Sequence, residues 1–140
     1  MGYTLKPFNK ECESIDFGTF SWPIMLQDTG MGYVLGYGQA KNPAQYVYQN
    51  GNVGSPVSND GYKITATEAK MMAKIARGYI SVKEYINKEW AELSEEDRER
   101  EKNLKYEGKS IYMPETGEKF LDQLRKFAEF AEKSKGFRVR

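Results

Sequence analysis

The side chains that could carry out catalysis are few in this sequence. It contains no histidine and a single cysteine, Cys12. Without histidine there is no imidazole base near neutral pH and no partner that could activate Cys12 as a nucleophile. The same composition excludes a tetrahedral zinc site of the usual kind. Gly32, Gly36 and Gly38 do not have the spacing of a phosphate-binding loop or of a dinucleotide fingerprint. Carboxylate chemistry, an oxygen-ligated Mg²⁺ or Ca²⁺ site and a lysine nucleophile remain, but no motif supports them, so we expect a protein that is not an enzyme and needs neither a metal nor a cofactor.

A long uncharged tract is the first candidate for a binding site. Between Phe17 and Ser58 only Asp28 and Lys41 carry a charge, and the tract is rich in aromatic rings, glycines and amides. Such a tract is typical of the interior of a fold with its turns, of the wall of a ligand pocket, or of an oligomer interface. Each interpretation requires most of the tract to be buried, and the first is favoured.

Two groups of basic residues are candidates for holding an anion. Lys70, Lys74 and Arg77 have the i, i+4, i+7 spacing of one helix face. Arg138 and Arg140 alternate with apolar residues, so on a strand both would point to one side and could clamp a phosphate or carboxylate. A solvated helix face and a favourable interaction with a helix dipole are the more ordinary explanations.

The length, composition and net charge are those of an ordinary single domain. The chain has 140 residues, 39% of them hydrophobic and 29% charged, with a net charge of +1. This length buries a real core without a disulfide or metal. A near-neutral total argues against a bulk nucleic-acid binder. The opening residues lack a signal-peptide core, no tract is continuously apolar, and the single cysteine fits a reducing compartment, so we expect a cytoplasmic protein with no membrane partner.

The first half of the chain reads as short elements. The segment SWPIMLQDTG predicts a two-turn helix, with Pro23 in its first turn and Gly30 as its left-handed stop. The segments GYVLGYG (32–38) and QYVYQ (45–49) predict short strands. Turn residues between them indicate a meander of two or three strands from Tyr33 to Thr65.

The second half reads as helical. The segment TATE (65–68) is a capping box that opens a helix, and SVKE (81–84) is a second box that predicts a new helix. The charged segment around 91–110 is either a solvated helix or a mobile loop. A final helix is predicted from the apolar stripe that begins at Phe120; Gly136 ends it, and the last residues, FRVR, add an edge strand.

The order of these motifs resembles a family of small accessory proteins of phages and bacteria. The matching features are an N-terminal aromatic helix, an Asn-Asp turn before a capping-box helix, and an ending of the form F-x-x-F-x-x-x-S-x-G-F. They fall on Trp22, Pro23, Asn59, Asp60, Thr67, Ala69, Phe127, Phe130, Ser134, Gly136 and Phe137. The resemblance implies a phage or prophage protein that sequesters a nucleotide signal or blocks a host defence component.

These observations predict an α+β domain spanning residues 1–140, with a small antiparallel sheet and two or three packed helices. We expect a non-catalytic sponge for a small anionic, nucleotide-like ligand, acting in the host cytoplasm. Rings stack on the ligand, an amide reads an edge of its base, and basic groups hold its charge. The residues chosen are Trp22, Tyr37, Tyr46, Tyr48, Asn59, Lys74, Arg77 and Arg138. The alternatives are a module that inhibits a host protein, a homo-oligomer formed through the uncharged tract and, least favoured, a carboxylate enzyme.

Overall fold

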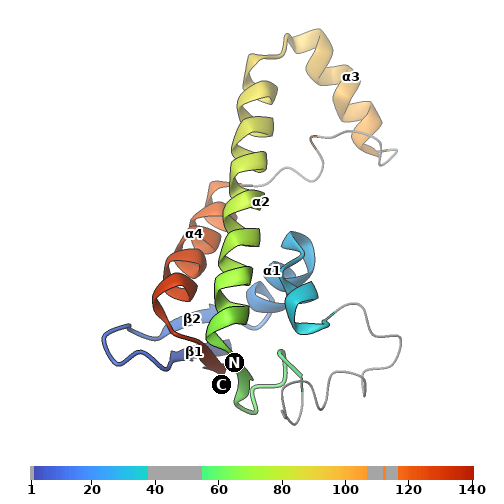
Figure 1. Cartoon of the computed structure of the whole chain (residues 1–140). Coiled ribbons are helices and arrows are strands. Elements are labelled where there is room, and N and C mark those ends of the chain that lie inside the picture. Colours follow the sequence, from blue (N-terminus) through green and yellow to red (C-terminus); the bar gives the residue numbers. More distant parts are fainter. Residues whose placement is uncertain (1, 38–54, 107–111, 113–116) are drawn as a thin grey trace.

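The fold is a four-stranded antiparallel sheet with helices packed on one of its faces (Figure 1). The computed structural model describes residues 2–37, 55–106, 112 and 117–140. The predicted α+β class, with a small antiparallel sheet and packed helices, is confirmed. In chain order the elements are β1 (Gly2–Pro7), β2 (Ile15–Gly18), α1 (Ser21–Thr29), η1 (Met31–Leu35), β3 (Tyr62–Ile64), α2 (Ala66–Glu92), α3 (Glu95–Tyr106), α4 (Glu118–Lys133) and β4 (Phe137–Val139).

The sheet brings both ends of the chain together. Its strand order is β2-β1-β4-β3, and every neighbouring pair is antiparallel. The C-terminal strand is therefore an interior strand, and the prediction of an edge strand there was wrong. Leu5 of β1 and Tyr62 of β3 both lie opposite Val139 in register, so pairing partners more than seventy residues away flank β4 on both sides. The N-terminal hairpin of β1 and β2 was not predicted.

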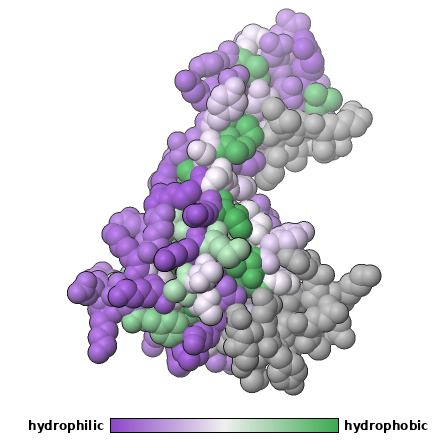
Figure 2. All heavy atoms as spheres, in the orientation of Figure 1, coloured by the Kyte–Doolittle hydropathy of each residue, from purple (hydrophilic) through white to green (hydrophobic). Residues whose placement is uncertain are grey.

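Alternation along the strands separates a covered face from an open one. Leu5, Phe17, Tyr62, Phe137 and Val139 are buried on the covered face, against α1, α2 and α4. The apolar stripe of α4 is buried as predicted, and α2 packs along α4 (Figure 1). On the face shown in Figure 2, hydrophobic side chains gather along the middle, where α1 and α2 lie. The core is thus a single layer between the helices and the sheet.

Local signals predicted the start of α2 correctly but not its length. The Thr65 hydroxyl accepts a hydrogen bond from the Glu68 amide at 3.2 Å, and the Glu68 carboxylate accepts one from the Thr65 amide at 2.9 Å. The predicted break at Ser81 was wrong, because α2 continues for 27 residues through Gly78 to Glu92. An interior glycine costs only about 1 kcal/mol, which does not end a helix already held by tertiary packing.

The strand predicted at 32–38 is instead a 3-10 helix over Met31–Leu35. Gly30 and Gly36 flank it with positive φ angles of 83° and 75°, so the chain turns at both ends. The turn buries Met31 and Leu35 but leaves Tyr33 exposed, whereas an alternating strand would place all three on one face. The strand predicted at 45–49 lies outside the described residues. In the described part of the expected meander, the strand is β3, and it pairs with β4 at the C-terminus.

The charged segment after α2 forms a helix between residues 95 and 106. Ser94 caps it, since the Ser94 hydroxyl accepts a hydrogen bond from the Asp97 amide at 3.2 Å. Arg98 donates to the last carbonyl groups of α2, at 3.2 Å to Trp90 and 2.6 Å to Ala91. At 1.5 Å per residue α2 is about 40 Å long and α4 about 24 Å, so α2 extends past α4 and carries α3 at its far end (Figure 1). None of the described helices is long and apolar enough to cross a bilayer.

Tyr3 makes the stability of the sheet sensitive to alkaline pH. Its hydroxyl donates to the Val57 carbonyl oxygen at 2.9 Å, and burial, followed by the nearby Tyr37, raises its pKa above the ordinary 10.0. The raised pKa belongs to the folded state, so this contribution is complete below pH 10 and is lost as the pH rises through the folded pKa. We expect Tyr3→Phe to lower the free energy of unfolding by about 1 kcal/mol at pH 8.

Urea unfolding of the wild type and Tyr3→Phe at pH 8, 10 and 11 measures this effect. The difference between the two proteins should shrink at the highest pH, because only the wild type has a hydroxyl at this position to ionise in the unfolded chain. A difference that stays constant across this range would contradict the expectation.

Candidate anion-binding site on the open face of the sheet

A row of positive side chains crosses the open face of the sheet. In register, Lys6 of β1 lies opposite Arg138 of β4, and Arg138 lies opposite Lys63 of β3. Each alternates with inward-facing neighbours along its strand, so the three side chains project from the same face. Because neighbouring strands lie about 4.8 Å apart, the three Cα atoms fall within about 10 Å.

This row costs stability in the absence of an anion. Like charges placed directly opposite each other on neighbouring strands are destabilising. Lys6 forms no ion pair with any residue that the structure describes. Departures of this kind from the rules of stable sheets are expected at functional positions. An anion bound across the row would remove the repulsion.

Phe8 and Gly61 hold the side chain at the centre of the row. Arg138 donates through Nη1 to the Gly61 carbonyl oxygen at 2.9 Å. Its Cζ lies 5.7 Å from the centroid of the Phe8 ring, and Lys63 Nζ lies 5.8 Å from the same centroid. Phe8 is 41% exposed, so it also offers apolar surface beside the cations. The hydrogen bond to the Gly61 carbonyl oxygen uses one nitrogen of the Arg138 guanidinium. A guanidinium has five N–H donors, so it can bond to further acceptors.

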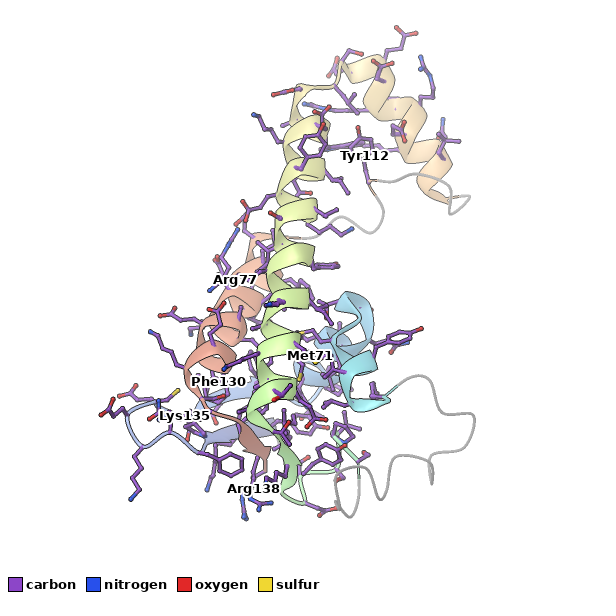
Figure 3. All side chains as sticks on the ribbon, viewed as in Figure 1. Met71, Arg77, Tyr112, Phe130, Lys135 and Arg138 are labelled. Carbon is purple, nitrogen blue, oxygen red and sulfur yellow. The ribbon has the colours of Figure 1, made fainter. Side chains whose placement is uncertain are left out.

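Arg140 extends the positive surface along β4. Its backbone exchanges hydrogen bonds with Thr4 at 2.7 and 2.9 Å, which continues the ladder of β1 and β4. A Cβ added to Gly61 would lie 3.7 Å from the guanidinium carbon of Arg140. The Arg140 side chain therefore runs over the turn before β3. Figure 3 shows Arg138 at the base of the molecule, in the part of the view farthest from α3.

Two described carboxylates lie near this face and reduce its positive charge. Asp16 of β2 lies opposite Thr4 and accepts a hydrogen bond from the Thr4 hydroxyl at 2.7 Å. Asp60 is exposed in the turn before β3. Among the described residues of this face, the four cations therefore outnumber the carboxylates by two.

Of the residues predicted to bind a ligand, Arg138 lies in this row and Asn59 lies apart from it. Asn59 has a positive φ of 61° and donates through Nδ2 to the Gly2 carbonyl oxygen at 2.7 Å. Gly2 is four residues from Lys6, or about 13 Å along an extended strand. The amide of Asn59 thus fixes the turn to the far end of β1.

The predicted stacking residues lie on the other side of the sheet or outside the described residues. Trp22 is fully buried, its ring centroid is 5.5 Å from that of Phe127, and its Nε1 donates to the Pro56 carbonyl oxygen at 3.0 Å. Tyr37 is half-buried and packs against the same core. In this structure neither ring reaches the open face. Tyr46 and Tyr48 lie outside the described residues.

The predicted basic row of α2 faces solvent and α4. Lys74 is exposed, and Arg77 forms an ion pair with Glu132 of α4, with Nη2 and Oε1 2.9 Å apart. The hydrogen bond to Glu132 raises the pKa of Arg77. The structure therefore uses Arg77 to join α2 to α4 and does not bring it near Arg138.

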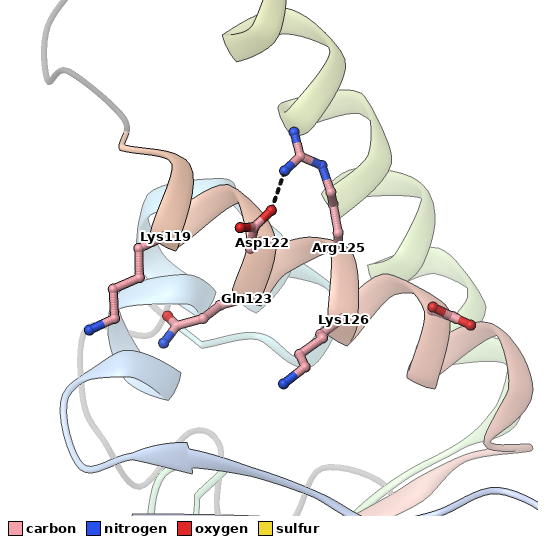
Figure 4. Close-up of a pocket in the computed structure, with 6 residues that line it drawn as sticks. Lys119, Asp122, Gln123, Arg125 and Lys126 are labelled. Carbon is pink, nitrogen blue, oxygen red and sulfur yellow. Dashed lines mark hydrogen bonds and ion pairs between the residues drawn. The ribbon is translucent and has the colours of Figure 1, made fainter.

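A wide, shallow hollow of about 630 Å³ lies along the outer surface of α4 (Figure 4). Its lining comes from that helix alone: Lys119, Asp122, Gln123, Arg125, Lys126 and Glu129. Arg125 is surrounded by carboxylates, at 2.6 Å from Asp122, 3.1 Å from Glu84 and 3.4 Å from Glu118. The charges of this hollow are mixed, so it selects an anion less well than the sheet does.

A smaller hollow of about 300 Å³ lies between α4 and the loop that joins β1 to β2. Cys12 lines it, and burial raises the pKa of this thiol, which reduces the fraction of reactive thiolate. Lys133, also in the lining, is paired with Glu129 at 2.9 Å. Among the residues that the structure describes, no group of three or more acidic, histidine or cysteine side chains could hold a metal ion.

Sequence reasoning did not select Lys6, Phe8 or Lys63 as site residues. Each cation of the row lies between two apolar residues, in the segments LKP, YKI and FRV. That repeated pattern was a usable signal of three strands with one basic face. The pairing of the strands was not visible, because it joins the two ends of the chain with a segment from its middle.

Comparison with known proteins gave no match. A scan against protein-family models, a search of curated proteins and a search of solved structures each found nothing similar to this chain. The resemblance to phage accessory proteins stays a prediction. The geometry of the open sheet face is the observation from which a function can be proposed.

Proposed function

We propose that the protein is a non-catalytic binding protein for a small, phosphate-bearing ligand of the nucleotide type, and that this ligand lies on the open face of the sheet. The observation that carries the proposal is the register of Lys6, Arg138 and Lys63 across three neighbouring strands. Arg138 is held in place by Gly61, so little side-chain freedom is lost when it binds an anion.

The chemistry of this face favours an anion over an apolar partner surface. Arginine and lysine form short, charge-assisted hydrogen bonds with phosphate oxygens. Phe8 places an aromatic surface within 6 Å of two of these cations, where a base or sugar attached to the phosphate can make contact. Sequestration of a host signal, as the resemblance implies, is one use of such a binding protein.

Thermal unfolding with a panel of nucleotides tests this proposal. We expect at least one of ATP, ADP, cyclic nucleotides or ADP-ribose to raise the unfolding midpoint, since a ligand at a hundred times its Kd adds about 2.7 kcal/mol. The double variant Lys6→Ala, Lys63→Ala should lose this shift. Without ligand, the single variant Lys6→Ala should be as stable as the wild type or more stable, because Lys6 has no described ion pair and its repulsion with Arg138 is gone.

A matched control is available on α2. The double variant Lys70→Ala, Lys74→Ala removes the same charge from two exposed lysines that no described residue pairs with. It should keep the shift of the wild type, apart from a small loss of long-range attraction. The proposal fails if no nucleotide moves the midpoint, or if both double variants lose binding equally.

A further inference from the structure

We infer that the ligand of the sheet face carries two or more adjacent phosphate groups, as in a nucleoside diphosphate or triphosphate. This inference rests on the proposed function and names the class of ligand within it. It follows from the spacing of the cations in the row and from where the row ends.

The charge of this face permits a single phosphate as well as several. Among the described residues, Lys6, Lys63, Arg138 and Arg140 supply four positive charges, and Asp16 and Asp60 supply two negative ones, a net of about +2. A single phosphate monoester carries about −1.5 to −2 charges near neutral pH, which already matches this net charge. The spacing of the cations is therefore the observation that favours more than one phosphate group.

The spacing of the cations favours a chain of phosphate groups over a single one. Lys6 and Lys63 are on the two strands that flank β4, so their Cα atoms are separated by two strand spacings, about 10 Å. Arg138 lies between them and is tethered to Gly61. One phosphate group at Arg138 would require both lysines to bend inward to reach it. A chain of phosphates laid across the strands gives each cation oxygens of its own.

The row is short across the strands, which argues against a long polynucleotide. Beyond Lys63 the structure describes no further strand, because β3 is the edge of the described sheet. On the other side β2 flanks β1, and its charged residue is Asp16. A polyanion that continued across the strands would therefore meet a carboxylate beyond Lys6.

Titration calorimetry in the absence of Mg²⁺ tests the inference. The probes are AMP, ADP, ATP, inorganic phosphate, inorganic pyrophosphate, tripolyphosphate and a ten-nucleotide oligouridine. We expect affinity to rise from AMP to ATP by about tenfold or more, since each added group meets another charged donor. Pyrophosphate and tripolyphosphate should compete with ATP at concentrations at which inorganic phosphate does not.

Single-residue variants then show which side chains bind the additional phosphate groups. Lys63→Ala should weaken ATP by about tenfold and AMP by much less, because the outer lysine meets only the longer chain. Lys74→Ala on α2 is the matched control and should bind ATP like the wild type. Equal losses for AMP and ATP in Lys63→Ala would overturn the inference.

The inference and the proposed function fail in different ways. If AMP binds as tightly as ATP and Lys6→Ala weakens both, the sheet face binds nucleotides but does not select adjacent phosphates. If the oligouridine binds and competes while pyrophosphate does not, the ligand is a polynucleotide and the inference is wrong. If none of the probes binds, the inference is wrong, and if no nucleotide of the thermal unfolding panel shifts the midpoint either, the proposed function itself is wrong.

Discussion

Trp22→Ala is expected to lower the free energy of unfolding by about 3–5 kcal/mol. The indole is fully buried and lies among three other rings, with centroid distances of 6.1 Å to Phe17, 5.5 Å to Phe127 and 6.3 Å to Phe137. These rings come from β2, α4 and β4, so Trp22 joins α1 to the sheet and to the C-terminal helix. The cavity cannot close without moving all three elements. Since small domains are stable by only about 5–15 kcal/mol, this loss is a large share of the total, and urea unfolding should show a midpoint at a much lower urea concentration.

Trp22→Phe separates the packing of this ring from its hydrogen bond. Phenylalanine keeps much of the aromatic contact but leaves the Pro56 carbonyl oxygen without the Nε1 donor that now lies 3.0 Å away. We expect a smaller loss, about 1–3 kcal/mol. If alanine at this position were tolerated with a loss below that of phenylalanine, the ring would not be the link between α1 and the core.

The helices could be predicted from the sequence because their signals are local. The capping box at Thr65 acts over three residues and is present with both of its hydrogen bonds. The α4 stripe, from Leu121 to Ala131, follows a helical period and is buried throughout. Where local rules failed, tertiary packing was the stronger effect: Ser81 lies inside α2 in spite of its capping-box pattern.

A small antiparallel sheet was predicted, but the order of its strands and the site were not, because they depend on pairings between distant segments. Phe137–Val139 has the residues of an edge strand, yet β1 and β3 flank it. The row of Lys6, Arg138 and Lys63 exists only through that arrangement. For the same reason Arg138 was selected for its own strand pattern while its two partners were missed. Trp22 was selected as a ring for a ligand, although a large ring in an uncharged tract is more often core, as it is here.

Gly136→Ala is the second large effect that we expect, and it connects the stability of the fold to the binding site. Gly136 has a φ of +93° and leads directly into β4, the strand that carries Arg138. A Cβ at this position would lie 2.7 Å from the Ile64 carbonyl oxygen and 2.9 Å from the Ala66 amide nitrogen, both backbone atoms at the junction of β3 and α2. The left-handed conformation alone costs an ordinary residue roughly 1–2 kcal/mol.

The clash adds to this strain, because neither backbone atom can move without disturbing the β3–β4 pairing or the capped start of α2. We expect a total loss on the order of 3 kcal/mol in urea unfolding. Gly78→Ala is the matched control: Gly78 is exposed inside α2, with nothing within 4 Å of an added Cβ, so the same substitution should stabilise the protein by about 0.5–1 kcal/mol. Under conditions where Gly136→Ala is still folded, its nucleotide affinity should also fall, since displacing β4 breaks the alignment of Arg138 with Lys6 and Lys63. Equal stabilities for the two alanine variants would show that β4 does not need the close approach at Gly136.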